Sequence, residues 1–309
     1  MPKVTTPEAL LVFAASLALT LSAAAVFGRR LDALGTRLGA TEAVIGLMTA
    51  LAADAPELSA AVIATLRGDH DLGVGVLLGS NAFNLAAMVG ITLLLGSRIA
   101  VPLRTLRAEA VAAALTLVGA VVVMAGIVPP ILVVALLALA TVPYARELEY
   151  RRVPRAIRPR PIAAAISVLA LELPAVVLVV IGCVGLVDSA TTLAERASLP
   201  HATTGFLILA IATSLPNVYT GLRFGLAGRG SALVSETLNS NSINLLGGLI
   251  IPSLVLAAPA LNGLVLANVA AVVLLTLIGL RGADGGGRPA GLALVGGFLL
   301  IAVVNAVAG

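Results

Sequence analysis

Two acidic residues and an amide stand out in the first third of the sequence, within apolar stretches long enough to cross a membrane. Asp54 and Glu57 lie three residues apart, and Asn84 follows them. An acid at the centre of a membrane helix costs about 2.5–3.5 kcal/mol, so it usually faces a partner, a cavity or an ion. We therefore interpret the pair as cation ligands. Pro56 lies between them and has no N–H, so we expect the helix to kink or break there and to free backbone carbonyls.

The same pattern of residues returns 160 positions later. Under this shift each of the following residues falls on one of its own type: Pro56 on Pro216, Ser80 on Ser240, Asn81 on Asn241, and Asn84 on Asn244. A repeat that keeps both the helix-breaking proline and the Ser-Asn-x-x-Asn element predicts two related halves. Internal duplication with interrupted apolar segments at matching positions is typical of secondary transporters, whose site lies where the repeats meet.

The composition excludes a soluble globule. The chain has 309 residues, of which 60% are hydrophobic and 11% charged, so too little polar sequence is present to cover a soluble fold of this size. We predict an all-α integral membrane protein. The single cysteine, Cys183, excludes a disulfide framework and a thiolate zinc site. No Ser-His-Asp, flavin or nucleotide motif is present, so we expect neither an enzyme nor a cofactor.

Apolar runs of the length that a bilayer requires predict ten transmembrane helices, five in each half. An odd number of spans in each half places the second half in the membrane the opposite way up, as an inverted-topology repeat requires. We expect a first repeat over residues 1–147, a basic hinge over 148–160 and a second repeat over 161–309. The predicted spans are 9–27, 40–66, 72–96, 107–127, 129–146, 161–187, 201–226, 231–257, 260–280 and 290–308.

The basic residues predict the orientation of these spans. With the N-terminus outside, 16 of the 19 Lys and Arg residues fall on inner connections, which is the arrangement of the positive-inside rule. We expect a multi-pass protein of a prokaryotic-type inner membrane with both termini outside, in contact with lipid. The basic run at 146–160 lacks aromatic interleaving, so we expect no nucleic-acid partner, and no obligatory protein partner is evident.

Two motifs carry a resemblance to a known family. Residues 205–217, GFLILAIATSLPN, and the segments GSNAFN at 79–84 and NSNSIN at 239–244 resemble the α-repeat signature of the cation/calcium antiporter superfamily. That signature is written G-T-S-x-P-E and G-S-N-I-x-N/D, and the resemblance covers essentially the whole chain. It implies ligand-bearing helices around the membrane midplane, which exchange Ca²⁺ for Na⁺, H⁺ or K⁺ by alternating access.

The resemblance also implies a set of ligands, from which this chain departs. Where the second repeat normally carries a glutamate the chain has Asn217, where an acid often ends the second element it has Asn244, and Asp54 stands at the position that matches Ser214. The site then holds at most two negative charges, both from the first repeat. The expected cation ligands are Asp54, Glu57, Ser80, Asn84, Thr213, Ser214, Asn217, Ser240 and Asn244, of which Asp54, Glu57, Asn84, Asn217 and Asn244 would contact a metal ion directly.

The charge of this site constrains the ion. Ca²⁺ takes six to eight oxygen ligands, and two carboxylates would neutralise it. Release of Ca²⁺ against two monovalent ions would keep the site balanced, so we expect a stoichiometry or coupling ion different from that of the three-sodium exchangers. Two neighbouring carboxylates in an apolar setting also disfavour simultaneous ionisation, which would suit proton exchange.

Further acids lie in or beside the spans. Glu236 precedes Ser240 by four residues and would share its helix face, so it could supply the missing charge or sit at a wetted helix entrance. Glu172 could line an ion pathway or be a buried hydrogen-bonded acid. Asp69, His70 and Asp71 form either a cation antechamber or a solvated turn. The alternatives to a calcium antiporter are a monovalent Na⁺/H⁺ exchanger, an exchanger of another divalent cation, and a cation-binding scaffold that does not transport.

Overall fold

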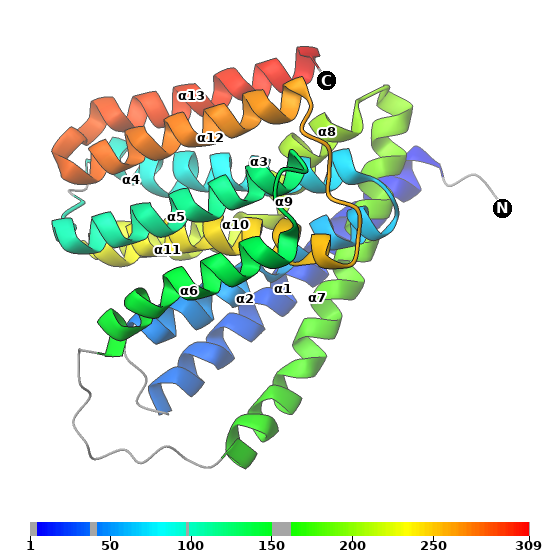
Figure 1. Ribbon diagram of the computed structural model, residues 1–309. Helices are drawn as coiled ribbons and strands as arrows, with labels where there is room; N and C mark the ends of the chain where they lie inside the picture. The colour runs from blue at the N-terminus through cyan, green and yellow to red at the C-terminus, as the bar shows by residue number, and fades with distance from the viewer. Residues whose placement is uncertain (1–4, 38–41, 97–98, 150–161, 309) are drawn as a thin grey trace.

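The protein is a helical bundle in a computed structural model that describes residues 5–37, 42–96, 99–149 and 162–308. These residues form helices and connections without a strand, which confirms the all-α expectation for the described part of the chain (Figure 1). The elements up to residue 149 are α1 (Thr6–Arg37), α2 (Glu42–Leu66), α3 (His70–Asn84), the π-helical η1 (Leu85–Gly90), α4 (Ile91–Leu94), α5 (Leu103–Met124) and α6 (Pro130–Glu149).

The remaining elements follow residue 161. They are α7 (Ile162–Ala197), α8 (His201–Thr203), η2 (Thr204–Leu209), α9 (Ala210–Thr213), α10 (Leu215–Leu226), α11 (Gly230–Leu245), η3 (Leu246–Ile250), η4 (Pro252–Leu254), α12 (Gly263–Arg281), η5 (Gly282–Gly286) and α13 (Gly287–Ala308). Two pairs of helices begin 160 residues apart, which is the spacing of the sequence motifs. α3 begins at 70 and α11 at 230, and α5 begins at 103 and α12 at 263. Most of the basic segment at 148–160 lies outside the described residues.

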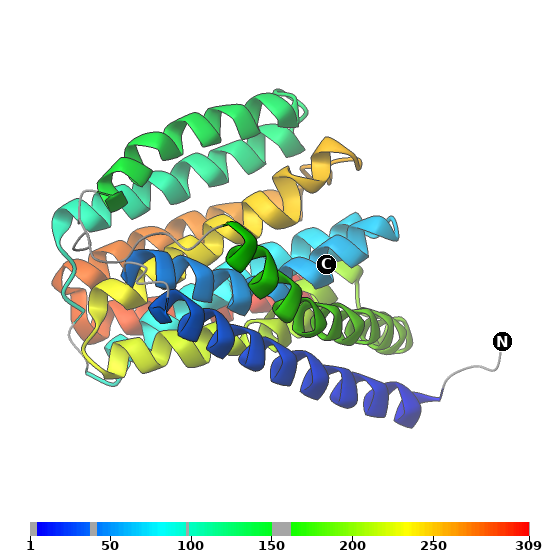
Figure 2. The same ribbon diagram turned by 90° about the horizontal axis from the view of Figure 1, so that it is seen from below.

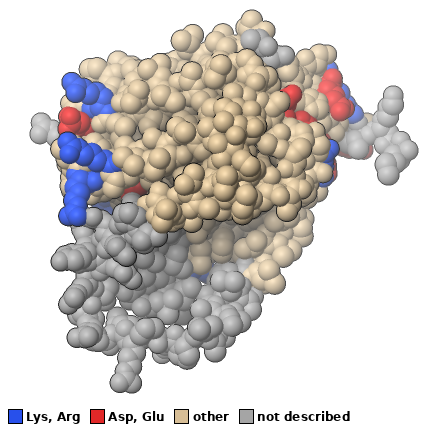
Figure 3. All heavy atoms as spheres, viewed as in Figure 1, with Lys and Arg blue, Asp and Glu red and all other residues tan. Residues whose placement is uncertain are grey.

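The helices have the length and composition of membrane spans. Within the described residues, five helical stretches are long and apolar enough to cross a membrane, and a bent pair, 201–213 with 215–226, makes a sixth. Large apolar side chains such as Leu136, Leu139 and Leu300 are exposed, as lipid-facing residues are. On the face in Figure 3, Lys and Arg gather at the end where α12 meets α13, and an uncharged surface separates them from charges at the other end. The full number of ten spans and their inverted relation stay predictions.

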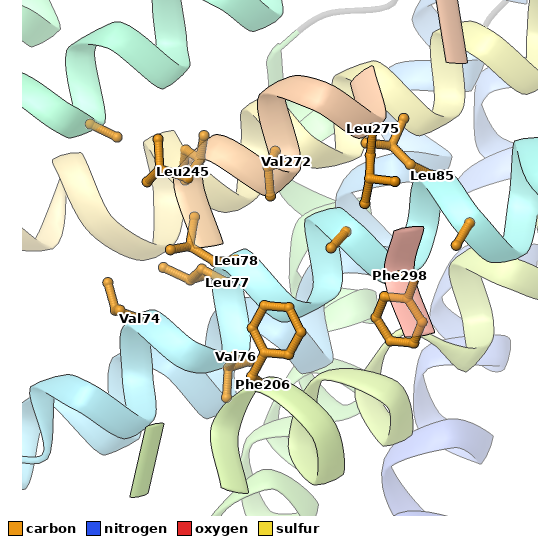
Figure 4. Close-up of a cluster of buried hydrophobic side chains, with 14 of the residues drawn as sticks. Val74, Val76, Leu77, Leu78, Leu85, Phe206, Leu245, Val272, Leu275 and Phe298 are labelled. Carbon is orange, nitrogen blue, oxygen red and sulfur yellow. The ribbon is translucent and has the colours of Figure 1, made fainter. Parts of the chain in front are cut away.

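α3 lies at the centre of the bundle. Nearly all of the membrane-length stretch from α3 to α4 is buried, between η2, α11, α12 and α13 (Figure 4). Phe206 lies beside Val76 and Leu77 of α3 in this core. Gly75 permits the close approach, because a Cβ atom there would lie 2.6 Å from the carbonyl oxygen of Ala202. α1 and α7 pack along each other away from this centre, as both views show (Figures 1 and 2).

The two prolines of the repeat have different effects. We expected α2 to kink or break at Pro56, but it continues through this residue as one α-helix without a break. The second half is interrupted instead: α9 ends at Thr213, α10 starts at Leu215 with Pro216 in its first turn, and the two helices differ in direction by 53°. Proline fits the first turn of a helix, where no N–H is needed, so Pro216 starts a helix where Pro56 lies within one.

Candidate cation-binding site

Four helical elements bring polar side chains to one place beside α3. α2 supplies Asp54 and Glu57, α3 supplies Asn84, the α9–α10 break supplies Ser214 and Asn217, and α11 supplies Ser240 and Asn244. All of these residues have no exposed surface. We call these seven residues the polar cluster, and hydrogen bonds link them across the two halves of the chain.

Glu57 accepts hydrogen bonds at both carboxylate oxygens. Oε1 accepts from the hydroxyl of Ser214 and, at 3.2 Å, from the amide nitrogen of Asn217. Oε2 accepts from the amide nitrogen of Asn244. All three donors come from the second half, so the charge of one half is held by neutral groups of the other.

Asp54 has one satisfied oxygen and one free oxygen. Its Oδ1 accepts from Ser240 Oγ at 2.5 Å and from Asn217 Nδ2 at 2.7 Å. Its Oδ2 is buried without a hydrogen-bond partner. The same Asn217 nitrogen lies 3.1 Å from Ser240 Oγ, which in turn accepts from Asn84 Nδ2 at 3.1 Å. A single amide nitrogen therefore joins both acids and a serine.

Several oxygen atoms of the polar cluster have no hydrogen-bond partner. A buried polar atom that lacks a hydrogen bond costs about 1–3 kcal/mol, so native proteins contain few of them. Carboxylate, amide and hydroxyl oxygens are the ligands that Ca²⁺ and other hard cations prefer. In the described part of the chain the unpartnered oxygens of the predicted site are Asp54 Oδ2, Ser80 Oγ, Asn84 Oδ1, Asn217 Oδ1, Asn244 Oδ1 and Glu236 Oε1. This donor set fits a hard cation.

Some predicted site residues do not take part in the cluster. Thr213 is buried, but its hydroxyl donates to the carbonyl of Leu209 at 2.8 Å within its own helix and makes no bond to either acid. The hydroxyl of Ser80 is buried and has no hydrogen-bond partner. Glu172 falls within α7, but its side chain lies outside the described residues.

Two features were missed from the sequence. Asn81 and Asn241 form a reciprocal pair, in which each amide nitrogen donates to the other's backbone carbonyl, at 3.1 and 3.2 Å. Asn81 also accepts from Asn244 at 3.1 Å. The sequence contained a signal for this pair, because Asn81 and Asn241 occupy matching positions of the two repeats, 160 residues apart. The second feature is Glu109 of α5, a buried acid that accepts from Ser235 of α11 at 2.8 Å.

A cleft of about 670 Å³ opens where α2, α3, α7 and α8 end or begin. Arg67 pairs with Asp188 across it, and His201 Nδ1 lies 2.5 Å from Asp69 Oδ2. Asp69 also caps α3 by accepting from the backbone N–H of Leu72 at 3.1 Å. Asp69 is thus fixed by a helix cap and by His201, and both contacts join one half of the chain to the other.

The polar cluster offers a metal ion oxygen ligands. Within the described residues no group of three or more His, Cys, Asp or Glu side chains is arranged to hold a metal ion. Cys183 is buried, and its Sγ lies 3.3 Å from the carbonyl oxygen of Pro56. Two carboxylates with amide and hydroxyl groups are instead the set that suits Ca²⁺ or an alkali ion.

Comparisons with known proteins agree with this architecture. The family model described as sodium/calcium exchanger protein matches residues 8–148 and again residues 167–307. A structure of the sodium-calcium exchanger NCX_Mj soaked with Na⁺ and Sr²⁺ is 20% identical, covers 96% of this chain and 98% of its own, and superposes with a TM-score of 0.65. The structure of native YfkE is 15% identical, covers 97% of each chain, and has a TM-score of 0.66. No curated protein matches the sequence.

Proposed function

Since the chain belongs to the sodium/calcium exchanger protein family, whose members are secondary transporters and not enzymes, we propose that it exports Ca²⁺ in exchange for Na⁺ or H⁺. It is an integral multi-pass membrane protein in which the transported ions are substrates and no cofactor is evident. The polar cluster is the proposed site of exchange, and alternating access opens it to each side in turn.

One observation carries this proposal: the polar cluster combines two carboxylates with buried oxygens that have no hydrogen-bond partner. Five such atoms belong to residues proposed as ligands, namely Asp54, Ser80, Asn84, Asn217 and Asn244. Ca²⁺ needs six to eight oxygens, and the two acids neutralise its charge. A cation thus satisfies both the electrostatics and the unmet bonding of the same atoms.

Asn217 and Asn244 would move between two orientations during the cycle. Each now turns its nitrogen toward Glu57, and Asn217 toward Asp54 as well, so N–H groups occupy directions that a cation would take. The terminal torsion of an asparagine is broad, and half a turn exchanges its nitrogen and oxygen. Rotation would present Oδ1 of each amide to the ion, and the serine hydroxyls would turn their hydrogens away.

The stoichiometry follows from the two acids of the cluster. The second repeat supplies Asn217 and Asn244, which are neutral, so the cluster holds two negative charges from Asp54 and Glu57. Exchange of one Ca²⁺ for two monovalent cations keeps this charge balanced, and three Na⁺ would leave one charge uncompensated. We therefore propose an exchange without net movement of charge, in contrast to a three-sodium mechanism.

The proposed arrangement in the membrane is an inverted repeat of five spans per half, with both termini outside. Matching starts of α3 and α11, and of α5 and α12, support the division into residues 1–147 and 161–309, with the hinge at 148–160. The reciprocal bonds between Asn81 and Asn241 support a two-fold relation between the halves. The distribution of basic residues supports the orientation and an inner membrane of prokaryotic type.

Flux into proteoliposomes tests the function. Radioactive Ca²⁺ uptake is measured against an outward Na⁺ or H⁺ gradient for wild type, Glu57→Gln and the control Glu195→Gln, whose side chain is exposed at the end of α7. We expect gradient-driven uptake in wild type and in the control. Glu57→Gln removes half of the charge, and we expect Ca²⁺ affinity to fall at least tenfold, about 1.4 kcal/mol.

The same vesicles separate the alternatives. Na⁺ movement against H⁺ without Ca²⁺ uptake would identify a monovalent exchanger, and uptake of Mg²⁺ or Mn²⁺ in place of Ca²⁺ would identify another divalent exchanger. Cation binding to the purified protein without any flux would identify a scaffold. A ratio of three Na⁺ per Ca²⁺ would refute the charge argument.

A further inference from the structure

A third acid lies buried beside the polar cluster. Glu236 of α11 is 3% exposed, and its Oε1 has no hydrogen-bond partner. No hydrogen bond or ion pair joins Glu236 to a Lys or Arg in the described ranges of the chain. An uncompensated buried charge is costly, so Glu236 either takes up a proton or, as a carboxylate, is paired with a cation.

The geometry of α11 directs Glu236 toward Asp54. Glu236 precedes Ser240 by one helical turn, and residues four apart lie about 5–6 Å apart on one helix face. Ser240 Oγ donates to Asp54 Oδ1 at 2.5 Å, which fixes the position of Asp54 beside this face. The other oxygen of Asp54, Oδ2, is also unpartnered. Two buried acids, each with one free oxygen, therefore lie near each other.

We propose that Glu236 and Asp54 together hold a second cation, an alkali-metal ion, next to the ion bound by Glu57 and the amides. With Glu236 the buried acids Asp54, Glu57 and Glu236 carry three negative charges, which one Ca²⁺ and one monovalent ion neutralise. A second divalent ion would leave an excess positive charge in the interior. This inference rests on the proposed cation site of the polar cluster and adds an alkali-metal ion as a second bound cation.

The second site is present on one side of the cluster only. Under the shift of 160 the position of Glu236 corresponds to Val76, which packs in the apolar core. Glu236 is six residues from the start of α11 at Gly230, about 9 Å along the helix axis. That end of α11 lies beside the start of α5, because a Cβ atom on Gly230 would be 2.7 Å from the backbone nitrogen of Ala100. The alkali-ion site therefore has no counterpart in the first repeat.

Binding of radioactive Na⁺ to purified protein, at saturating Ca²⁺, tests the inference without any requirement for transport. The variant is Glu236→Gln, and the matched control is Glu109→Gln, a buried glutamate on the neighbouring helix α5. We expect one Na⁺ per wild-type or control protein and none in Glu236→Gln. Competition with K⁺ shows which alkali ion the site prefers.

A second variant keeps the test informative if Glu236→Gln fails to fold. Glu236→Asp retains the charge but shortens the side chain, so we expect Na⁺ to bind about tenfold more weakly than in wild type. Sodium bound equally to wild type and Glu236→Gln, or no bound sodium in wild type, would overturn the inference. The cluster itself is judged by Glu57→Gln: if this variant keeps normal Ca²⁺ affinity, the proposed function fails, whereas the Glu236-dependent sodium is still measured.

Discussion

Asn217 holds two acids together with a neutral amide. Its nitrogen lies 2.7 Å from Asp54 Oδ1, 3.2 Å from Glu57 Oε1 and 3.1 Å from Ser240 Oγ. An amide N–H₂ group provides two donors and carries a partial positive charge, so it reduces the repulsion between the carboxylates. The cluster can therefore remain closed when no metal ion is bound.

Replacement of Asn217 by Asp reverses this effect. The change removes both donors and adds a third carboxylate, so we expect the free energy of unfolding without cation to fall by about 1–3 kcal/mol. We expect Ca²⁺ to raise the Tm of Asn217→Asp more than that of wild type, because the ion neutralises the added charge. Thermal unfolding in detergent, with a chelator and with Ca²⁺, measures both effects.

Asn262 offers a control for the same substitution. It is exposed, and its side chain caps α12 by accepting from the backbone N–H of Val265 at 2.9 Å. Asp caps a helix as well as Asn does, so Asn262→Asp should leave the Tm unchanged. Equal Tm values for Asn217→Asp and wild type in chelator would show that the amide does not hold the acids together.

The sequence predicted which acids and amides would be near one another, but not how they bond. The spacing of Asp54, Glu57, Asn217 and Asn244 within the two repeats was enough to place them together, and their role as ligands stays a proposal. Thr213 shows the limit of such reasoning. A threonine hydroxyl in a helix can donate to the carbonyl four residues earlier, and this local bond competes with any distant partner.

At the scale of elements, the contact of α3 with α8 and η2 positions the cluster. A Cβ atom on Gly75 would lie 2.6 Å from the carbonyl oxygen of Ala202 and 3.1 Å from the backbone nitrogen of Phe206. Both are backbone atoms, so neither can turn aside. Since α3 also carries Asn84, a displacement here changes the site as well as the packing.

We expect Gly75→Ala to lower the free energy of unfolding by about 1–3 kcal/mol, the usual cost of an overpacked core. Ca²⁺ uptake should fall with it, because α3 must shift away from α8 and η2. The matched control is Gly296→Ala on α13, where a Cβ atom would meet nothing within 4 Å. Thermal unfolding and Ca²⁺ uptake into vesicles are measured for both variants. Equal stability and equal uptake in Gly75→Ala and Gly296→Ala would contradict the close contact at Gly75.

Helices were predictable from apolar runs of membrane length, whereas their internal irregularities were not. The π-helical segments η1 and η3 each follow the Ser-Asn-x-x-Asn element, at Leu85–Gly90 and Leu246–Ile250. A π-helical turn accommodates an extra residue within an α-helix, and apolar composition gives no signal for it. The two prolines likewise look equivalent in sequence, yet only Pro216 follows a break.

For the whole molecule, the predicted orientation can be tested with single cysteines. Ala197 ends α7 and Ala227 follows α10, and both are exposed. In a Cys183→Ala background we expect a membrane-impermeant maleimide to label Ala197→Cys in intact cells. Ala227→Cys should react only after permeabilisation, because the basic connection around it is predicted to lie inside.

The parent Cys183→Ala protein is the control for background labelling. Labelling of Ala227→Cys but not Ala197→Cys in intact cells would invert the orientation. Labelling of both before permeabilisation would contradict the number of spans between them. The sequence could predict this arrangement because helix length, apolar composition and charge are all properties of local segments.

The packing of the halves was beyond local reasoning. The shift of 160 predicted that residues correspond, but the contact of Asn81 with Asn241 depends on how α3 meets α11. The contacts Arg67–Asp188 and Asp69–His201 depend in the same way on how α2 and α3 meet α7 and α8.

The Asn81–Asn241 pair is unchanged when the two halves exchange places, because each asparagine makes the same bond to the other. In the proposed inverted-repeat arrangement such a contact has the same energy in the inward-facing and the outward-facing conformation, so it can serve as a pivot and favours neither. Arg67 and Asp188 correspond instead to Ala227 and Gly28, which cannot form an ion pair. Any preference of the resting transporter for one side of the membrane must therefore arise from contacts such as Arg67–Asp188, which have no counterpart in the other half.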